Sequence, residues 1–161
     1  MKKIFIVAVA MLLTFTAFAQ DGRSIYNKYS DAKGVSAVYV SPAMFRLIKH
    51  IPQLEVEGVD ISPLIKSLDG LYVIDSENDS INKSIANDAE KFVKSGNYEL
   101  LMEVKDDGEV VHMYTAGKKD IINSFVLITS EPGECTFICF TGEINRNDLE
   151  KAIGAIAQEA M

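Results

Sequence analysis

The chain has 161 residues, with 23 acidic residues against 16 basic ones and a formal charge of −7. This acidic balance disfavours binding to nucleic acid or to anionic lipid, because both reward surface patches of Lys and Arg. The length suits one domain with a hydrophobic core of its own.

The first 19 residues have the pattern of a cleaved signal peptide. Lys2 and Lys3 supply the positive start, residues 4–15 an uncharged apolar run, and residues 17–19 a small-x-small cleavage motif. The apolar run is shorter than the roughly 20 residues of a membrane span, so an uncleaved N-terminal anchor is the less favoured alternative. We therefore predict a signal peptide over residues 1–19.

Cleavage after Ala19 leaves a single α+β domain of residues 20–161, whose formal charge is −9 because two lysines leave with the signal. Gln20 stands where a lipoprotein would carry its lipid-bearing Cys, so the chain is not an obvious lipoprotein. The sequence predicts an exported protein, periplasmic or secreted, that keeps no membrane span after signal cleavage.

The mature chain begins with a predicted helix and a predicted strand. Apolar residues at helical spacing indicate the helix over 23–32, and β-branched and aromatic residues indicate the strand over 35–41. Ser41 and Pro42 then start a second helix as its N-cap and first helical residue. The inner face of this helix, which Pro52 is expected to end, consists of Phe45, Leu47, Ile48 and Ile51.

Turn signals mark the next segment. Residues 54–59 look like a charged connector, and Ser62-Pro63 repeats the cap-and-proline start for a short helix. Asp69-Gly70 is predicted as a turn.

A strand over 71–75, a helix over 78–95 and the strand that follows suggest a right-handed βαβ crossover. The long helix has the clearest amphipathic pattern in the chain. Its apolar stripe consists of Ile81, Ile85, Ala89, Phe92 and Val93.

Four consecutive strands then form a predicted meander over residues 98–143, at 98–106, 109–117, 122–130 and 134–143. Between two and four residues connect successive strands, and such short turns allow only antiparallel pairing. A last helix, capped by Asn145 or Asn147, follows the meander. Its apolar stripe consists of Leu149, Ala152, Ile153, Ile156 and Ala160.

These elements together predict the fold class. We expect an α+β domain of two layers, in which helices pack on a mixed, mainly antiparallel sheet of about six strands. The four-strand meander forms the C-terminal part of that sheet.

The last two predicted strands are apolar on both faces. Phe125 and Leu127 point to one side while Val126 and Ile128 point to the other, and the strand 134–143 has the same pattern. Strands of this kind are usually covered on both faces. The chain could cover them itself, with helices on both sides or a strongly curved sheet; alternatively, a protein partner or a second copy covers one sheet face.

The two cysteines are not expected to form a disulfide. Cys135 and Cys139 lie in one predicted strand, where four residues span about 13 Å. A disulfide needs Cα atoms within roughly 7 Å of each other, and the same separation prevents both thiolates from binding one metal ion. We expect two buried, reduced thiols.

The sequence assigns no catalytic, cofactor-binding or metal-ligating residue and no cofactor. Its two histidines, His50 near a helix end and His112 in mid-strand, have no partner that the sequence identifies. The zinc motif HExxH, the nucleophile motif GxSxG and the phosphate-loop motifs GxGxxG and GxxxxGK are absent.

Asp75, Glu77 and Asp79 alternate as in a calcium-binding loop. The pattern fails because Ser80 stands at the sharp-turn Gly position and Ala86 at the position of the bidentate Glu. Acidic residues at a helix start are the better explanation.

Several segments, in their order along the chain, carry a family resemblance. They are Lys28-Tyr29-Ser30, Gly34-Val35-Ser36-Ala37-Val38-Tyr39-Val40-Ser41, Met44-Phe45-Arg46-Leu47, Tyr98-Glu99-Leu100-Leu101-Met102, Val104-Lys105-Asp106-Asp107-Gly108 and Phe140-Thr141-Gly142-Glu143-Ile144. Together they resemble the exported family catalogued as domain of unknown function 4252, found in Gram-negative bacteria of the Bacteroides type. The resemblance implies an envelope protein, associated with envelope sigma-factor operons, and carries no activity, cofactor or catalytic residue. Some relatives carry a lipid-attachment Cys where this chain has Gln20.

The sequence thus favours a non-enzymatic, exported module that binds a protein partner, or a second copy as a homodimer, through a sheet face. The resemblance links such a module to envelope stress. One alternative is a hydrolase or small-ligand binder with a pocket near His112 and Tyr114. An inhibitor or chaperone-like protein would differ from the first hypothesis only in its partner.

Overall fold

The computed structural model describes residues 22–56 and 58–159, so the predicted signal peptide and Ala160 lie outside the described residues. Helices and strands fill most of the described chain. In order they are α2 (Arg23–Tyr29), β1 (Val35–Val40), α3 (Pro42–Ile48), β2 (Glu55–Val56), β3 (Val59–Asp60), α4 (Ser62–Ser67), β4 (Leu68–Ser76), α5 (Asp79–Ser95), β5 (Glu99–Asp106), β6 (Glu109–Lys118), β7 (Ile121–Glu131), β8 (Glu134–Asn145) and α6 (Arg146–Glu159).

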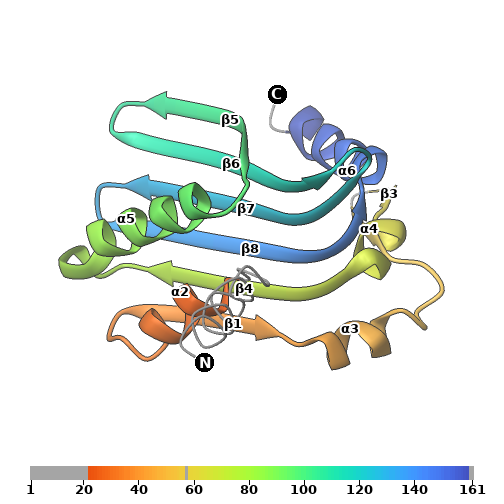
Figure 1. The fold of residues 1–161 in the computed structure, drawn as a ribbon, viewed down its shortest axis with the longest axis horizontal. Coiled ribbons are helices and arrows are strands. Elements are labelled where there is room, and N and C mark those ends of the chain that lie inside the picture. Colours follow the sequence, from red (N-terminus) through yellow and green to blue (C-terminus); the bar gives the residue numbers. More distant parts are fainter. Residues whose placement is uncertain (1–21, 57, 160–161) are drawn as a thin grey trace, which may run out of the picture.

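Six of the strands form one sheet in the order β1-β4-β8-β7-β6-β5, and every neighbouring pair is antiparallel (Figure 1). β5 to β8 lie side by side in chain order, so the predicted meander is confirmed, as is the α+β class with helices packed on the sheet. α5 connects β4 to β5, which run in the same direction but have β8, β7 and β6 between them. The predicted crossover therefore joins strands that are not neighbours.

The turns of the meander have the backbone geometry that their residues predict. Asp107 and Gly108 both have positive φ angles, 40° and 92°, as a two-residue hairpin turn of the primed type requires. Lys119, in the next turn, also has a positive φ of 54°. These tight turns fix the register of the neighbouring strands.

One face of the sheet, here called the α5 face, is covered by α2 and α5 (Figure 1). Ile85, Ala89 and Phe92 of α5 are buried in one cluster with Ile74 of β4 and Phe137 of β8. The stripe predicted for this helix is thus confirmed, because the five apolar positions lie on the side that meets the sheet.

The opposite face, here called the open face, has a second core cluster. Among the described residues this cluster consists of Phe45, Leu68, Ile122, Phe125, Ile144 and Leu149, with Leu64 and Ile65 packed against it. Its helical members come from α3, α4 and α6, which gather at the end of the sheet away from the β5–β6 and β7–β8 turns (Figure 1). Helices on both faces therefore explain part of the two-sided apolar pattern of β7 and β8. The part of the open face near those turns has no helix over it among the described residues.

The predicted inner face of α3 is largely wrong. The helix ends at Ile48, before Pro52, and only Phe45 is buried; Leu47 is 68% exposed and Ile51 is 41% exposed. A helix of two turns contacts the sheet along one side, and a residue two positions after Phe45 points away from that side.

The predicted start of α4 is also displaced. Ile61 occupies the N-cap position, and Ser62 is the buried first helical residue, whose Oγ accepts a hydrogen bond from the N–H of Leu54 at 2.7 Å. Asp60 takes over the capping role, since its Oδ1 accepts from the N–H of Ser62 at 2.9 Å. The preceding segment is not a plain connector, because β2 and β3 pair as a small hairpin.

Asp69 and Gly70 do not form a turn. They lie inside β4, at a β-bulge between Leu68 and Gly70. Thr141 of β8 donates a hydrogen bond to Asp69 Oδ1 at 2.7 Å, and the missing Cβ of Gly70 leaves room for the Thr141 hydroxyl. A bulge uses the same residue types as a turn, which explains the error.

Candidate functional site

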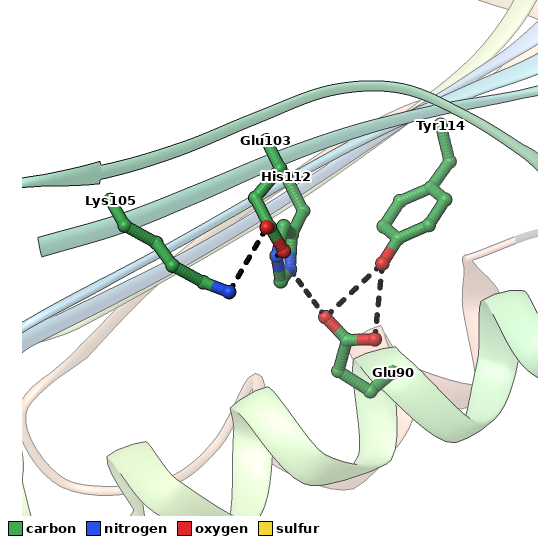
Figure 2. Close-up of polar contacts among 5 residues, drawn as sticks. All are labelled: Glu90, Glu103, Lys105, His112 and Tyr114. Carbon is green, nitrogen blue, oxygen red and sulfur yellow. Dashed lines mark hydrogen bonds and ion pairs between the residues drawn. The ribbon is translucent and has the colours of Figure 1, made fainter.

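His112 lies in the middle of β6 on the α5 face, between two carboxylates. Its Nδ1 is 2.6 Å from Oε1 of Glu90 on α5, and its Nε2 is 2.7 Å from Oε2 of Glu103, its cross-strand neighbour in β5 (Figure 2). The His112 side chain is 17% exposed; its contact with Glu90 is partly buried, whereas its contact with Glu103 is open to water.

Tyr114 and Lys105 extend this group. The Tyr114 hydroxyl lies 3.1 and 3.3 Å from the two carboxylate oxygens of Glu90, and Lys105 Nζ lies 3.0 Å from Glu103 Oε1. Burial, together with the negative charge of Glu90, raises the pKa of Tyr114 to about 12. The hydrogen bond from Lys105, followed by that from His112, lowers the pKa of Glu103. Figure 2 shows His112 and Tyr114 pointing at Glu90, with Lys105 beside Glu103 at the other side of the group.

The chemistry open to this cluster is limited by its own hydrogen bonds. A carboxylate oxygen only accepts, so the two ring nitrogens of His112 both donate when both contacts are formed. A general base needs a free ring nitrogen aimed at its substrate, and a Tyr with a pKa near 12 remains a neutral phenol at neutral pH. The geometry favours a structural connection of α5 to the β5–β6 hairpin over proton transfer.

The sequence had singled out His112 and Tyr114 but neither of the glutamates. Glu103 could have been found, because a two-residue turn at Asp107-Gly108 places it directly opposite His112. Glu90 could not, since its approach depends on how α5 crosses the sheet. His50 lies apart from the cluster, exposed and two residues beyond α3 on the open-face side.

The two cysteines are buried and form no disulfide, as strand geometry predicted. Cys135 and Cys139 both point to the α5 face, where Cys139 Sγ lies 3.6 Å from Ser124 Oγ. Burial, with a smaller contribution from the charge of Asp75, raises the pKa of Cys135 to about 11. A neutral, enclosed thiol is a poor nucleophile and a poor metal ligand.

The acidic segment of Asp75, Glu77 and Asp79 lies where β4 ends and α5 begins. Asn78 Oδ1 accepts from the N–H of Ser80 at 3.1 Å, and Asn78 Nδ2 donates to the carbonyl of Lys33 at 2.8 Å. Among the residues that the structure describes, no group of three or more His, Cys, Asp or Glu is placed to hold a metal ion.

A row of apolar side chains crosses the uncovered part of the open face. One residue from each strand of the sheet forms an apolar row in which every neighbour pair is in register: Val38, Val73, Ile138, Leu127, Met113 and Met102. The ends of this row are the most open, since Val38 is 48% exposed and Met102 40%. Leu127 and Met113, in the middle of the row, pack against the edge of the open-face cluster, so the row is open mainly towards its two ends. Exposed apolar side chains that form a continuous row are typical of an interaction surface.

A second row lies parallel to the apolar row at the turn end of the same face. Glu134 pairs with Glu131, and Glu109 pairs with Asp106. The two pairs are neighbours, because Val110 and Ser130, each next in sequence to Glu109 and Glu131, are opposite each other in β6 and β7. We call these four residues the acidic row. The charge of Asp75, and after it a hydrogen bond to Glu131, raises the pKa of Glu134.

Residues 29–152 match the model of a family described as domain of unknown function DUF4252. The chain belongs to the DUF4252 family. The match spans β1 to β8 and includes the His112 cluster and both rows of the open face. No curated protein and no solved structure matches the chain.

The DUF4252 description assigns no activity, so no functional residue can be transferred from it. Membership in the family therefore says nothing about chemistry, which has to be argued from the residues of this chain. Within the described part of the chain, no helix has the length and apolar content needed to cross a membrane.

Proposed function

We propose that the mature chain is an exported, non-enzymatic module of the bacterial envelope that binds another protein through the open face of its sheet. Export is supported by the signal-peptide pattern of residues 1–19. A role in envelope stress is supported by the resemblance of the sequence to exported proteins of this family. The partner is a protein because the surface offers apolar side chains next to carboxylates, which repel nucleic acid and anionic lipid.

The observation that carries the proposal is the apolar row. Packing of α3, α4 and α6 buries only one end of the open face, and Val73 and Ile138 remain half-buried beyond it. An apolar surface of this kind costs free energy in water, at roughly 25 cal/mol for each Å² that a partner would cover. A protein that covers the row regains that free energy.

Two double variants test the proposal in capture experiments from envelope extract. Val38→Gln with Met102→Gln removes the two open ends of the row, whereas Met44→Gln with Leu47→Gln removes two apolar side chains on α3 that are at least as exposed. Immobilised mature protein is compared with both variants by quantitative mass spectrometry. We expect the row variant to lose its specific partners by about tenfold or more, and the α3 variant to keep them. Equal capture by both variants and the unmodified protein would contradict the proposal.

A second candidate function is a hydrolase or small-ligand binder at His112. The gathering of His112 with Glu90, Glu103 and Tyr114 favours it, while the occupation of both ring nitrogens counts against it. With only two histidines in the chain, His50 serves as an internal reference in an NMR fragment screen. A fragment that shifts the ring resonances of His112 and leaves those of His50 unchanged would support this candidate.

A further inference from the structure

The two rows of the open face define the shape of the surface that a partner must match. The apolar row crosses all six strands, whose spacing of about 4.8 Å gives it a length of about 24 Å. A strand bound along the sheet edge would contact one end of this row only. An element that covers the whole row has to lie across the strands.

An α-helix has the dimensions for this position. About 16 residues of helix, at a rise of about 1.5 Å each, match the length of the row. The acidic row lies four residues further along each strand, at about 13 Å from the apolar row. A helix with its side chains is about 10–12 Å wide, so one centred on the apolar row extends about 5–6 Å to each side. The acidic row lies beyond that edge, so only extended Lys or Arg side chains on this flank approach its carboxylates.

The charge of the surface fixes the chemistry of that flank. Ion pairs among the described residues include none of the four side chains of the acidic row. Asp75 and Glu77 add their negative charge near Glu134, whose pKa is raised by these neighbours. Lys and Arg on the partner would relieve this repulsion, and Asp or Glu there would increase it.

A second copy of the chain fits the surface less well. In the aligned class of face-to-face packing, two sheets keep their strand directions within about 30° of each other. The partner copy would then place its acidic row against the acidic row of the first copy or against α3, α4 and α6. The formal charge of −7 adds long-range repulsion between copies.

We propose that the open face binds an amphipathic helix of about four turns that lies across the six strands, with its apolar side on the apolar row and a basic flank over the acidic row. This inference rests on the proposed function and specifies its partner. Binding is then weakened by salt, because part of it comes from exposed charge pairs.

Synthetic peptides of about 18 residues test this inference by fluorescence anisotropy with the mature protein. The probe carries Leu at helical spacing and Lys along one flank. One control has Glu in place of Lys, and another has the same composition in scrambled order. We expect the probe to bind about tenfold more tightly than either control, and to weaken at high salt.

Variants of the protein assign the binding to the two rows. Val38→Gln with Met102→Gln should lower the affinity for the probe about tenfold, whereas Met44→Gln with Leu47→Gln should leave that affinity unchanged. Glu131→Gln with Glu134→Gln should lower the affinity for the Lys probe. The same variant should bind the Glu control as weakly as before or somewhat more tightly. This last variant removes repulsion between neighbouring carboxylates, so the fold is expected to tolerate it.

Three results would overturn the inference. The first is equal affinity of the protein for the probe and for the controls. The second is an affinity for the probe that the Glu131→Gln and Glu134→Gln changes leave unaltered. The third is a stable homodimer, measured by sedimentation equilibrium, that buries the apolar row. If the peptides fail while the row variant still loses its captured partners, the helix is wrong and the binding function stands. If the Val38→Gln, Met102→Gln variant keeps both its captured partners and its affinity for the probe, the inferred helix and the proposed binding function are both wrong.

Discussion

Tyr114 and Cys135 are held in protonation states that their burial dictates. The pKa of Tyr114 is raised to about 12 and that of Cys135 to about 11. A raised pKa means that the folded chain holds the proton more tightly than the unfolded chain. The stabilisation from each group is therefore complete below its ordinary pKa and is lost as the pH rises through the folded value.

The first prediction concerns alkaline stability. Between about pH 9 and pH 12 the free energy of unfolding should fall, with Tyr114 contributing up to about 2 kcal/mol of the change at the high end. Tyr114→Phe should flatten the part of the curve above pH 10, and Cys135→Ala the part between about pH 9 and 11. Urea unfolding at a series of pH values measures both. A Tyr114→Phe curve parallel to that of the unmodified protein above pH 10 would contradict the assignment.

One of the two glutamates at His112 could be predicted from the sequence, and the other could not. The register of the β5–β6 hairpin follows from its Asp-Gly turn, so the pairing of His112 with Glu103 was within reach of the sequence. Glu90 is 22 residues from His112, and only the path of α5 over the sheet brings them together. Contacts of this kind depend on packing and leave no local pattern.

At the scale of elements, a helix was predicted well where one whole side of it meets the sheet. α5 packs its stripe on the α5 face along its length, so periodicity alone located its buried residues. α3 has seven residues and touches the sheet at Phe45, which is too little contact for a stripe to be informative.

Close approaches between elements give a second prediction. A Cβ on Gly142 of β8 would lie 2.2 Å from the carbonyl oxygen of Ser67, where α4 runs into β4. Gly154, in α6, has open space around the same position. Gly142→Ala should destabilise the protein by about 2–4 kcal/mol, whereas Gly154→Ala should stabilise it by about 1 kcal/mol through helix propensity.

Thermal and urea unfolding of the two glycine variants form a matched comparison, since each adds one methyl group. A small effect at Gly142 would mean that the α4–β4 junction moves easily. That result would contradict the close packing of β8 against Ser67.

At the scale of the whole molecule, two core clusters share one sheet. β7 contributes Val126 to the cluster on the α5 face and Phe125 to the cluster on the open face. Adjacent residues of one strand cannot unfold separately without breaking the same hydrogen-bond ladder. The two clusters therefore belong to a single cooperative unit.

The third prediction follows from this sharing. Ile85→Ala in the first cluster and Ile144→Ala in the second, which are 0% and 1% exposed, should each cost about 2–5 kcal/mol. Each variant should lower the midpoint of one and the same unfolding transition, followed by circular dichroism and by tyrosine fluorescence. Separate transitions for the two variants would show that the clusters unfold independently.

The sequence by itself determined the elements with local causes. The four-strand meander follows from turns too short for any other pairing, and α5 follows from its apolar stripe. That Cys135 and Cys139 form no disulfide follows from their separation along one strand. The α+β class and the DUF4252 family followed from the order of these elements and motifs. Each of these conclusions depends on residues that are close together in the chain.

Only the tertiary structure decided which surfaces are covered. Whether a partner is needed for the second face of β7 and β8 depends on where α3, α4 and α6 pack, and they pack at one end. The apolar and acidic rows likewise exist only because six strands from distant parts of the chain align in register. Local sequence determines which segments form strands. Which side chains lie next to each other on a sheet face depends on the order and register in which those strands pair, and the tertiary structure decides both.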